Sequence, residues 1–224
     1  MERNQSNVSE DIRAGHSDVD LVAKWIISSG IQSGEGGFYA WLDLQNKSYS
    51  YLYSEITGYG ITSLLFLYKI FGEKAFIDKA ELAADWIISK SIHSCGGVKT
   101  RLYEDNKKAD KRYCFTGEKI FSFDTGIVLY GIINLYKLTR KAKYLQISES
   151  LADFIIDKMH QQDGTLSPIY DAKIGETIES EDKWSNQQSG FHAKVSMGLV
   201  DLYGIKRNNK YRDAAVKLCE YAVT

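Results

Sequence analysis

The sequence has little of several features that would place a protein in a class at once. Its 224 residues include one proline and three cysteines, and its formal net charge is −1. A chain so poor in proline is compatible with long helices, and a nearly neutral chain has no overall attraction for nucleic acid. Cys95, Cys114 and Cys219 are odd in number and contain no short-spaced pair. This cysteine usage favours reduced thiols over a disulfide framework.

Motifs for nucleotide, cofactor and metal chemistry are also absent from the sequence. It contains no Gly-x-x-x-x-Gly-Lys phosphate loop, no dinucleotide fingerprint and no Gly-x-Ser-x-Gly elbow. His93, Cys95 and Cys114 match no zinc spacing. We therefore predict no cofactor and no metal.

The N-terminal residues 1–16 are polar, and residues 1–15 hold no apolar run. They therefore predict neither a secretion signal nor a membrane anchor. We expect them to form a disordered tail, residues 17–224 to form a single domain, and the protein to be cytoplasmic.

What the sequence does contain is a threefold repeat of about 68 residues. The repeat is visible in three sets of residues, each separated by 68 and then 67 positions: Leu67-Tyr68, Leu135-Tyr136 and Leu202-Tyr203; Phe76, Tyr144 and Tyr211; Trp86, Phe154 and Tyr221. A period of this length is typical of stacked supersecondary units that bury their apolar faces against one another. The fold is therefore set by the structure of one unit.

Each unit reads as two helices joined by a short turn. The first helix is apolar on nearly every side, which predicts a buried inner helix, and the second has one apolar stripe, which predicts a half-exposed outer helix. The predicted inner and outer pairs are 57–71 with 74–90, 125–138 with 142–159, and 193–203 with 210–224, preceded by an unpaired outer helix, 18–29. The sequence thus predicts an all-α fold of about three and a half helical hairpins.

The connections between these helices also follow a pattern. Gly72 is placed to end the first inner helix in a left-handed conformation. Outer helices are followed by glycine-bearing loops at 32–38, 94–98 and 161–166, with alternating apolar residues that predict short β-hairpin strands, including a return strand over 113–115. Trp25 and Trp86, on the predicted outer helices, are expected in the core.

Two segments at the start of the inner helices carry a family resemblance. Tyr53-Ser54-Glu55-Ile56-Thr57-Gly58-Tyr59 and Phe121-Ser122-Phe123-Asp124-Thr125-Gly126, set in repeated hairpins with Gly-Gly loops, resemble the six-hairpin α/α toroids. That superfamily includes unsaturated glucuronyl hydrolases, N-acylglucosamine 2-epimerases and the toroid of glucuronyl C5-epimerases. The first segment is also similar to a Pro-Glu-x-Thr-Gly-Tyr pattern in toroid proteins of polysaccharide biosynthesis clusters.

The resemblance implies carbohydrate chemistry over residues 18–224. A closed toroid of that kind has six hairpins and this chain has about three and a half. The chain is therefore expected to be a fragment, an open arc, or a half-ring that a second copy completes as a homodimer. The exposed flanks of an arc would be apolar and would favour a partner.

The repeat also indicates where a site would lie. Inner helices direct their N-terminal ends to one mouth, where Glu55 and Asp124 fall within two residues of the matched Thr57 and Thr125, and where His192 matches Thr125. Two carboxyl groups and an imidazole are the groups that hydrolysis, β-elimination or epimerisation of a glycan requires. We predict Glu55, Asp124 and His192 as catalytic residues.

Substrate-binding residues are predicted around this mouth. Aromatic rings would stack on sugars, and basic side chains would pair with a uronate carboxylate; these are Tyr53, Tyr59, Trp41 and Trp184, and Arg101, Arg112 and Lys194. The predicted function is that of a glycoside hydrolase, lyase or epimerase acting on an oligo- or polysaccharide, including uronic-acid-containing ones.

Other interpretations of the same residues remain open at this stage. Glu55 and Asp124 would also be favoured at helix starts without any catalytic role, and His192 would also fit a core. The chain as a whole could be a non-catalytic helical-repeat module that binds a glycan or a protein. A terpenoid-cyclase-like toroid, suggested by Gln161-x-x-Asp163-Gly164, ranks last because no Asp-rich diphosphate-binding run accompanies it.

Overall fold

A computed structural model of the chain describes residues 18–103, 118–178 and 188–223. The helices in these ranges are 18–28, α2 (Ser54–Phe71), α3 (Lys74–Trp86), α4 (Ser122–Thr139), α5 (Ala142–Phe154), α6 (Ser196–Lys206) and α7 (Asn209–Val223). None of these helices is long and apolar enough to span a bilayer.

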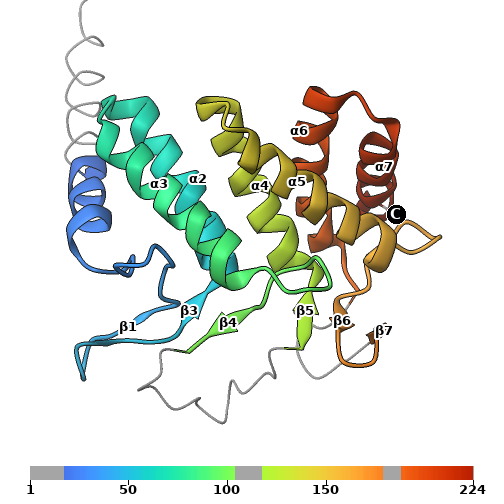
Figure 1. Cartoon of the computed structure of the whole chain (residues 1–224), viewed down its shortest axis with the longest axis horizontal. Helices are drawn as coiled ribbons and strands as arrows, with labels where there is room; N and C mark the ends of the chain where they lie inside the picture. The colour runs from blue at the N-terminus through green and yellow to red at the C-terminus, as the bar shows by residue number, and fades with distance from the viewer. Residues whose placement is uncertain (1–17, 104–117, 179–187, 224) are drawn as a thin grey trace, which may run out of the picture.

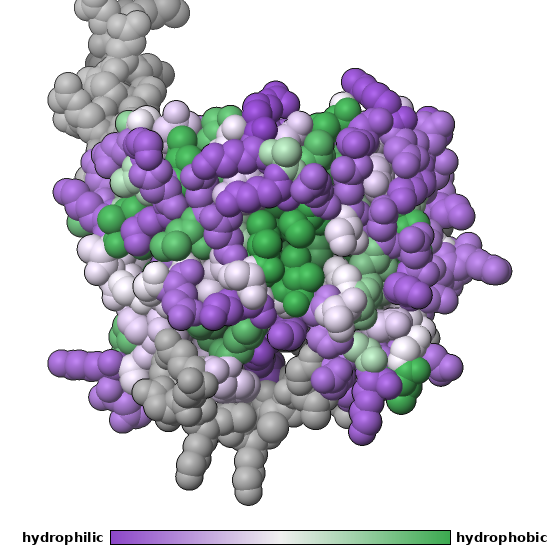
Figure 2. Space-filling view, in the orientation of Figure 1, coloured by the Kyte–Doolittle hydropathy of each residue, from purple (hydrophilic) through white to green (hydrophobic). Residues whose placement is uncertain are grey.

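The helices form three antiparallel hairpins side by side in chain order, with helix 18–28 before the first (Figure 1). Helices α2, α4 and α6 form an inner layer, in which α4 packs between α2 and α6, and α3, α5 and α7 form the outer layer. The predicted all-α architecture with an open set of about three and a half hairpins is confirmed. Figure 2 shows that the outer face is largely hydrophilic, with an apolar area between α3 and α5.

Each inner helix ends in the same way. Gly72 follows α2 with φ 71°, as predicted, and Arg140 and Arg207 take the same left-handed conformation after α4 and α6, with φ 58° and 56°. In the two arginine caps the guanidinium lies 5.7 Å from the ring of a tyrosine four residues earlier, Tyr136 or Tyr203. Tyr136 and Tyr203 therefore pack against the arginines that end their helices, which is a structural role.

Two of the outer helices end in a π-helical turn, Ile87–Ser91 after α3 and Ile155–Met159 after α5. The glycine loops that follow outer helices each rest on the next outer helix. A Cβ on Gly36, for example, would lie 2.2 Å from the backbone oxygen of Leu82 in α3, and the φ of Gly36 is 115°. Glycine is required at this position by both its backbone conformation and its surroundings.

Short antiparallel strands lie at the N-terminal ends of the inner helices (Figure 1). The pairs are β1 (Leu42–Asp43) with β2 (Ser48–Tyr49), β3 (Leu52–Tyr53) with β4 (Arg101–Leu102), and β5 (Lys119–Phe121) with β6 (Ile169–Asp171) and β7 (Glu176–Ile178). The predicted return strand over 113–115 lies outside the described residues. Because β3 and β5 run directly into α2 and α4, they fix the starts of both helices.

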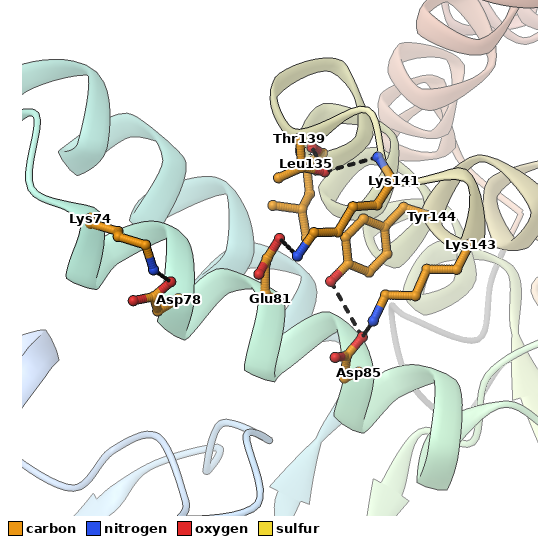
Figure 3. Close-up of polar contacts among 9 residues, drawn as sticks. All are labelled: Lys74, Asp78, Glu81, Asp85, Leu135, Thr139, Lys141, Lys143 and Tyr144. Atoms are coloured by element: carbon orange, nitrogen blue, oxygen red, sulfur yellow. Dashed lines mark hydrogen bonds and ion pairs between the residues drawn. The ribbon is translucent and has the colours of Figure 1, made fainter.

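Ion-pair triads join neighbouring outer helices at matched repeat positions. The two triads are Asp85, Lys143 and Tyr144, drawn in Figure 3, and Asp153, Lys210 and Tyr211. In the first, the lysine nitrogen lies 2.5 Å and the tyrosine hydroxyl 3.3 Å from the carboxylate, and in the second these distances are 2.6 and 3.2 Å. The same contact thus fastens the second hairpin to the first and the third to the second.

The two ends of the arc leave repeat positions uncovered. Leu65, Ile133 and Val200 match one another in the repeat, yet their exposures are 6%, 0% and 53%, because no inner helix follows α6 within the described residues. At the other end Trp25 is 49% exposed, so its predicted core location is wrong, whereas Trp86 is buried as expected. The reason is that no hairpin precedes helix 18–28 within the described residues.

Candidate active site

The mouth of the arc is built where β3 enters α2 and β5 enters α4. Tyr53 and Phe121 have extended backbones, and the helices begin at Ser54 and Ser122. This change from strand to helix places Glu55 and Asp124 in the first turns of their helices, where the helix dipole favours negative charge.

Asp124 is 4% exposed, and its Oδ2 atom has no hydrogen-bond partner among the described residues. Burial raises the pKa of this carboxyl well above its usual range, and the negative charge of Glu55 raises it further. Thr100 and the guanidinium of Arg101 lie close enough to oppose part of this shift. Asp124 is therefore held towards its protonated form.

Glu55 has different surroundings. Partial burial raises the pKa of its carboxyl above the ordinary value, and the nearby Tyr53 hydroxyl and the positive charge of Lys194 oppose part of this rise. Tyr53 feels the charges of both carboxyls, which together with burial raise the pKa of its hydroxyl. The structure therefore brings Glu55, Asp124 and Tyr53 together at one mouth and gives the two acids unlike environments.

Arg101 reaches this mouth from β4. Its guanidinium carbon lies 5.0 Å from the ring centroid of Tyr51 and 5.9 Å from that of Tyr53. The ring of Tyr51 also contacts Trp41, at 5.1 Å between centroids, and Trp41 is 41% exposed. An aromatic cluster therefore extends from the carboxyl pair towards solvent, and the binding roles predicted for Trp41 and Arg101 stay predictions.

Sequence reasoning missed Tyr51 and Thr100 as members of this site. Both lie one or two residues from predicted members on the short strands β3 and β4. The available signal was that Tyr51 and Thr100 directly precede the strand residues Leu52 and Arg101. However, the pairing of β3 with β4 links segments about 50 residues apart. No local pattern in the sequence indicates that register.

Lys194 and Tyr59 lie on the two flanks of the mouth. The Lys194 nitrogen donates a hydrogen bond of 2.8 Å to the Tyr59 hydroxyl and lies 4.6 Å from its ring centroid. Tyr59 belongs to α2, and Lys194 to the 3₁₀ turn Gly190–Val195 that precedes α6. This contact joins α2 to the turn before α6 and brings the positive charge near Glu55.

His192 lies in a more enclosed setting. It is 2% exposed, its Nδ1 is 3.2 Å from the Ser189 backbone oxygen, and its ring packs near Phe123 and Phe191. Burial lowers its pKa to about 4, so the ring is neutral near pH 7. Among the described residues no hydrogen bond or ion pair connects His192 to Glu55 or Asp124.

The repeat gives a structural reason for the position of His192. Thr57 and Thr125 occupy the matching positions, and both are fully buried. The hydroxyl of each accepts a bond from a preceding loop, from Phe38 N–H at 2.9 Å and from Val98 N–H at 3.4 Å. His192 thus occupies a position that is buried and bonded to a preceding loop in the other two units. Its predicted catalytic role stays a prediction.

Two predicted binding residues, Arg112 and Trp184, lie outside the described residues. Over the ranges that the structure does describe, no group of three or more His, Cys, Asp or Glu side chains is arranged to hold a metal ion.

Comparison with known proteins gives one family match. The model of glycosyl hydrolase family 76 matches residues 20–218. A search of curated proteins gave no match.

Solved structures share the fold at low sequence identity. The cellobiose 2-epimerases of Spirochaeta thermophila and Bacillus thermoamylovorans superpose with TM-scores of 0.74 and 0.72, at 11% and 16% identity, covering 96% and 90% of this chain and 54% and 52% of theirs. A family 76 mannosidase of Bacteroides thetaiotaomicron gives a TM-score of 0.60 at 16% identity, covering 77% of this chain and 44% of its own. The chain therefore spans about half the length of the structures that it matches.

Proposed function

Because the chain belongs to glycosyl hydrolase family 76, we propose that it hydrolyses glycosidic bonds, with Asp124 as the general acid and Glu55 as the general base. The observation that carries this proposal is the pair of carboxyls at one mouth in unlike surroundings. Burial raises the pKa of both carboxyls, but the rise is stronger for Asp124, where the charge of Glu55 adds to it, than for Glu55, where Tyr53 and Lys194 oppose it. The carboxyl with the stronger rise suits the acid role and the other suits the base role.

In the proposed reaction each carboxyl handles one proton. Asp124 donates its proton to the glycosidic oxygen while the bond from that oxygen to the anomeric carbon breaks. Glu55 takes a proton from a water molecule whose oxygen attacks the anomeric carbon. The products are two sugars, with Asp124 ionised and Glu55 protonated, and exchange of one proton with solvent resets the site.

The proposed substrate is an α-linked mannan or a related glycan, because solved family members that share the fold include α-1,6-mannanases. Arg101 places positive charge near Asp124, and Lys194 places positive charge near Glu55. A uronate unit in the glycan would complement these charges, which supports acidic glycans as a second substrate class. Epimerisation is the alternative reaction, favoured by the higher TM-scores of the two cellobiose 2-epimerases.

The test is an activity panel with the purified chain. It would be incubated with α-1,6-mannooligosaccharides, cellobiose and uronate-containing oligosaccharides, and products would be separated by chromatography. We expect new reducing ends from a glycan, and their loss in Asp124→Asn and Glu55→Gln variants that remain folded. An epimer of unchanged chain length would replace hydrolysis by the alternative, and binding of a glycan without any product would support the non-catalytic module instead.

We also propose that a second copy of the chain completes the ring, as a homodimer. Exposed apolar side chains at both ends of the arc support this, with Leu21, Val22, Trp25 and Phe66 at one end and Val200, Val216 and Tyr221 at the other. A groove of about 550 Å³ between helix 18–28 and α2 adds to the first of these surfaces. Since the chain spans about half of the matched toroids, two copies would supply a full ring.

Light scattering of the purified chain tests the assembly. A mass of about twice 25.4 kDa that falls to one chain in a Val200→Asp variant would support the homodimer. A monomer at every concentration would contradict it. The cytoplasmic location expected from the polar N-terminal residues stays a prediction.

A further inference from the structure

A cavity lies on the face of the β3–β4 ladder that is turned away from Tyr53 and Arg101. Leu52 pairs with Leu102 and Tyr53 pairs with Arg101, so the two leucines project from one face of the ladder and the other two side chains from the opposite face. The leucines line a cavity of about 430 Å³, a volume in the range of small-molecule sites. It is therefore distinct from the site of the carboxyl pair.

The walls of this cavity carry aromatic rings from separate segments. Tyr39 follows the first glycine loop, 32–38, and its ring stacks on that of Tyr49 at 5.0 Å between centroids and an angle of 15°. Trp86 ends α3, and Tyr103 follows β4. Because Trp86 is buried and Tyr39 is stacked, both rings are held in place before a ligand arrives. Flat apolar surfaces of this kind suit the ring of a sugar.

One charge of each sign stands at the edge of the cavity. Glu35 belongs to the glycine loop and Lys90 to the π turn Ile87–Ser91, and their side chains are 69% and 54% exposed. The Lys90 nitrogen lies 3.9 Å from the Glu35 carboxylate, which is longer than a hydrogen bond, so ligand hydroxyls can bond to both groups. Because the two charges balance, a neutral polar ligand fits this edge better than an anion does.

The loop that carries Glu35 recurs in all three units, but the ring that lines the cavity does not. In each loop one residue donates its N–H to a backbone oxygen four positions later, at 2.8, 2.8 and 2.9 Å: Ser33, His93 and Gln161. The position of Tyr39, six residues after each donor, holds Lys99 in the second unit and Ser167 in the third. The loop is therefore a common scaffold, and Tyr39 is a feature of the first unit.

We propose that this cavity is a second glycan-binding site, which takes one neutral pyranose unit. Tyr39 and Trp86 supply the apolar walls, Glu35 accepts hydrogen bonds from sugar hydroxyls, and Lys90 donates to them. The ring of Tyr103 contacts that of Tyr51 at 5.3 Å between centroids, so one wall of the cavity adjoins the aromatic cluster of the mouth. The inference goes beyond hydrolysis and rests on the proposed function only for the choice of a sugar as ligand.

The test is a titration followed by NMR of the tryptophan indole N–H groups. The chain has four tryptophans, and Trp25→Phe, Trp41→Phe and Trp184→Phe identify the Trp86 signal by elimination. The probes are methyl α-mannopyranoside and methyl β-glucopyranoside, with sodium glucuronate as the anionic comparison. We expect a neutral glycoside to shift the Trp86 signal saturably in the millimolar range, as is typical for so small a ligand, and glucuronate to bind more weakly.

Lys90→Met and Lys158→Met form a matched pair of variants. Lys158 is an exposed lysine at the same place in the π turn after α5, Ile155–Met159, but only Lys90 lines the cavity. Loss of a charged hydrogen-bond donor should raise the Kd of the neutral glycoside by about ten-fold in Lys90→Met. Lys158→Met should leave the Kd unchanged.

A second variant obstructs the cavity without removing a charge. Gly34 also lines the cavity, and a Cβ there would meet no heavy atom of the described residues within 4 Å, so Gly34→Phe is compatible with the fold. This variant should abolish the shift of the Trp86 signal. Asp124→Asn should bind the glycoside with the wild-type Kd, because Asp124 belongs to the mouth.

The outcomes separate this inference from the proposed function. If neither neutral glycoside shifts the Trp86 signal saturably, or if Lys90→Met and Gly34→Phe bind as wild type does, the cavity is not a sugar site. Tighter binding of glucuronate would contradict the neutral class of ligand. Binding by a chain that is inactive in the panel above would count against the proposed function alone.

Discussion

The outer wall of the arc and its mouth are built on the same repeat but differ in how closely they follow it. In the wall, Asp85 with Lys143 and Asp153 with Lys210 make the same contact one unit apart, at 2.5 and 2.6 Å. At the mouth, Glu55 matches Phe123, and Asp124 matches Ile56. Residues that recur from unit to unit join the hairpins, whereas Glu55 and Asp124 occupy positions at which the units have different residues.

The difference is not one of location alone, because recurring positions also occur at the mouth. Ser54 and Ser122 are both fully buried and bond to backbone oxygens of neighbouring segments, Lys99 and Pro168. Thr57 and Thr125 receive loop N–H groups in the same manner. Since these matched residues make the same contacts in the first and second units, the unmatched Glu55 and Asp124 are the residues left to be explained by chemistry.

The largest expected effect is that of Asp124→Asn on activity. Removal of a general acid should lower kcat by about 10²- to 10⁴-fold on the substrate identified in the panel. Matched Ile56→Val, which alters the equivalent position in α2, should change kcat by less than about three-fold, within the range of a mild core substitution. Product formation followed over time with both variants measures this difference.

The same variant should gain stability in a pH-dependent manner. The pKa of Asp124 is raised in the folded protein, so above the ordinary aspartate pKa the unfolded chain ionises while the folded site resists ionisation. Wild-type stability therefore falls as pH rises through that window, and Asp124→Asn lacks this loss. Denaturant unfolding should show the advantage of the variant growing from about pH 4 upward. An advantage that shrank with rising pH would contradict the assignment of Asp124.

The second prediction concerns an interior and an edge position of one repeat register. Ile133 of α4 is fully buried, so Ile133→Ala should cost about 2–5 kcal/mol in the free energy of unfolding. Val200, its match on α6, is 53% exposed, and Val200→Ala should cost less than about 0.5 kcal/mol in the isolated chain. Denaturant titrations at low protein concentration measure both values.

Protein concentration sharpens this second comparison. If a second copy covers Val200, the cost of Val200→Ala should rise with protein concentration, because assembly then contributes to stability. The cost of Ile133→Ala should depend on concentration only as wild type does. Equal costs for the two variants at low concentration would show that α6 is not an open edge.

The third prediction concerns replacement of His192 by threonine, which is the residue at the matching positions of the other two units. The pKa of His192 is about 4 in the folded protein, against about 6.5 when unfolded. Below pH 6.5 the unfolded chain therefore gains a proton that the folded chain does not, and stability should fall by up to about 3 kcal/mol towards pH 4. His192→Thr should remove this acid sensitivity, as unfolding at a series of pH values would show.

The activity of His192→Thr shows whether His192 has a structural or a catalytic role. If the role is structural, kcat should stay within a few-fold of wild type after correction for the folded fraction. A loss of about 10²-fold or more in folded protein would establish the catalytic base that the sequence predicts.

Much of the fold could be predicted from the sequence because each helix of the repeat has its own pattern of apolar residues over a short stretch. The helix ends at Phe71 and Met159 agree with the predicted ends, since helical periodicity and Gly72 identify them. The αL caps at Arg140 and Arg207 and the π turns after α3 and α5 could not be read in this way. They depend on ring packing and on the loop that follows, which single residues do not reveal.

The site could be predicted only in part. Helices α2 and α4 begin at Ser54 and Ser122, three residues before the predicted starts at 57 and 125, which was close enough to single out Glu55 and Asp124. The partner of Tyr53 was not, because Arg101 reaches it through a two-residue ladder that joins distant segments. Exposure of Trp25 was missed for a related reason, since sequence pattern shows which face of a helix is apolar but not whether a neighbour covers it.

The smallest expected effect is that of the wall triads. Lys143 and Asp85 are 49% and 47% exposed, and Lys210 and Asp153 are 37% and 41% exposed, so solvent screens both pairs. Double-mutant cycles with Lys143→Met and Asp85→Asn should give a coupling of about 0.2–1 kcal/mol, weaker at high salt. The matched cycle at Lys210 and Asp153 should give the same value within error, with no change in kcat for either set. A coupling well above this range in one triad alone would mean that the two hairpin interfaces are not equivalent, and the wall would then lose the regularity that sets it apart from the mouth.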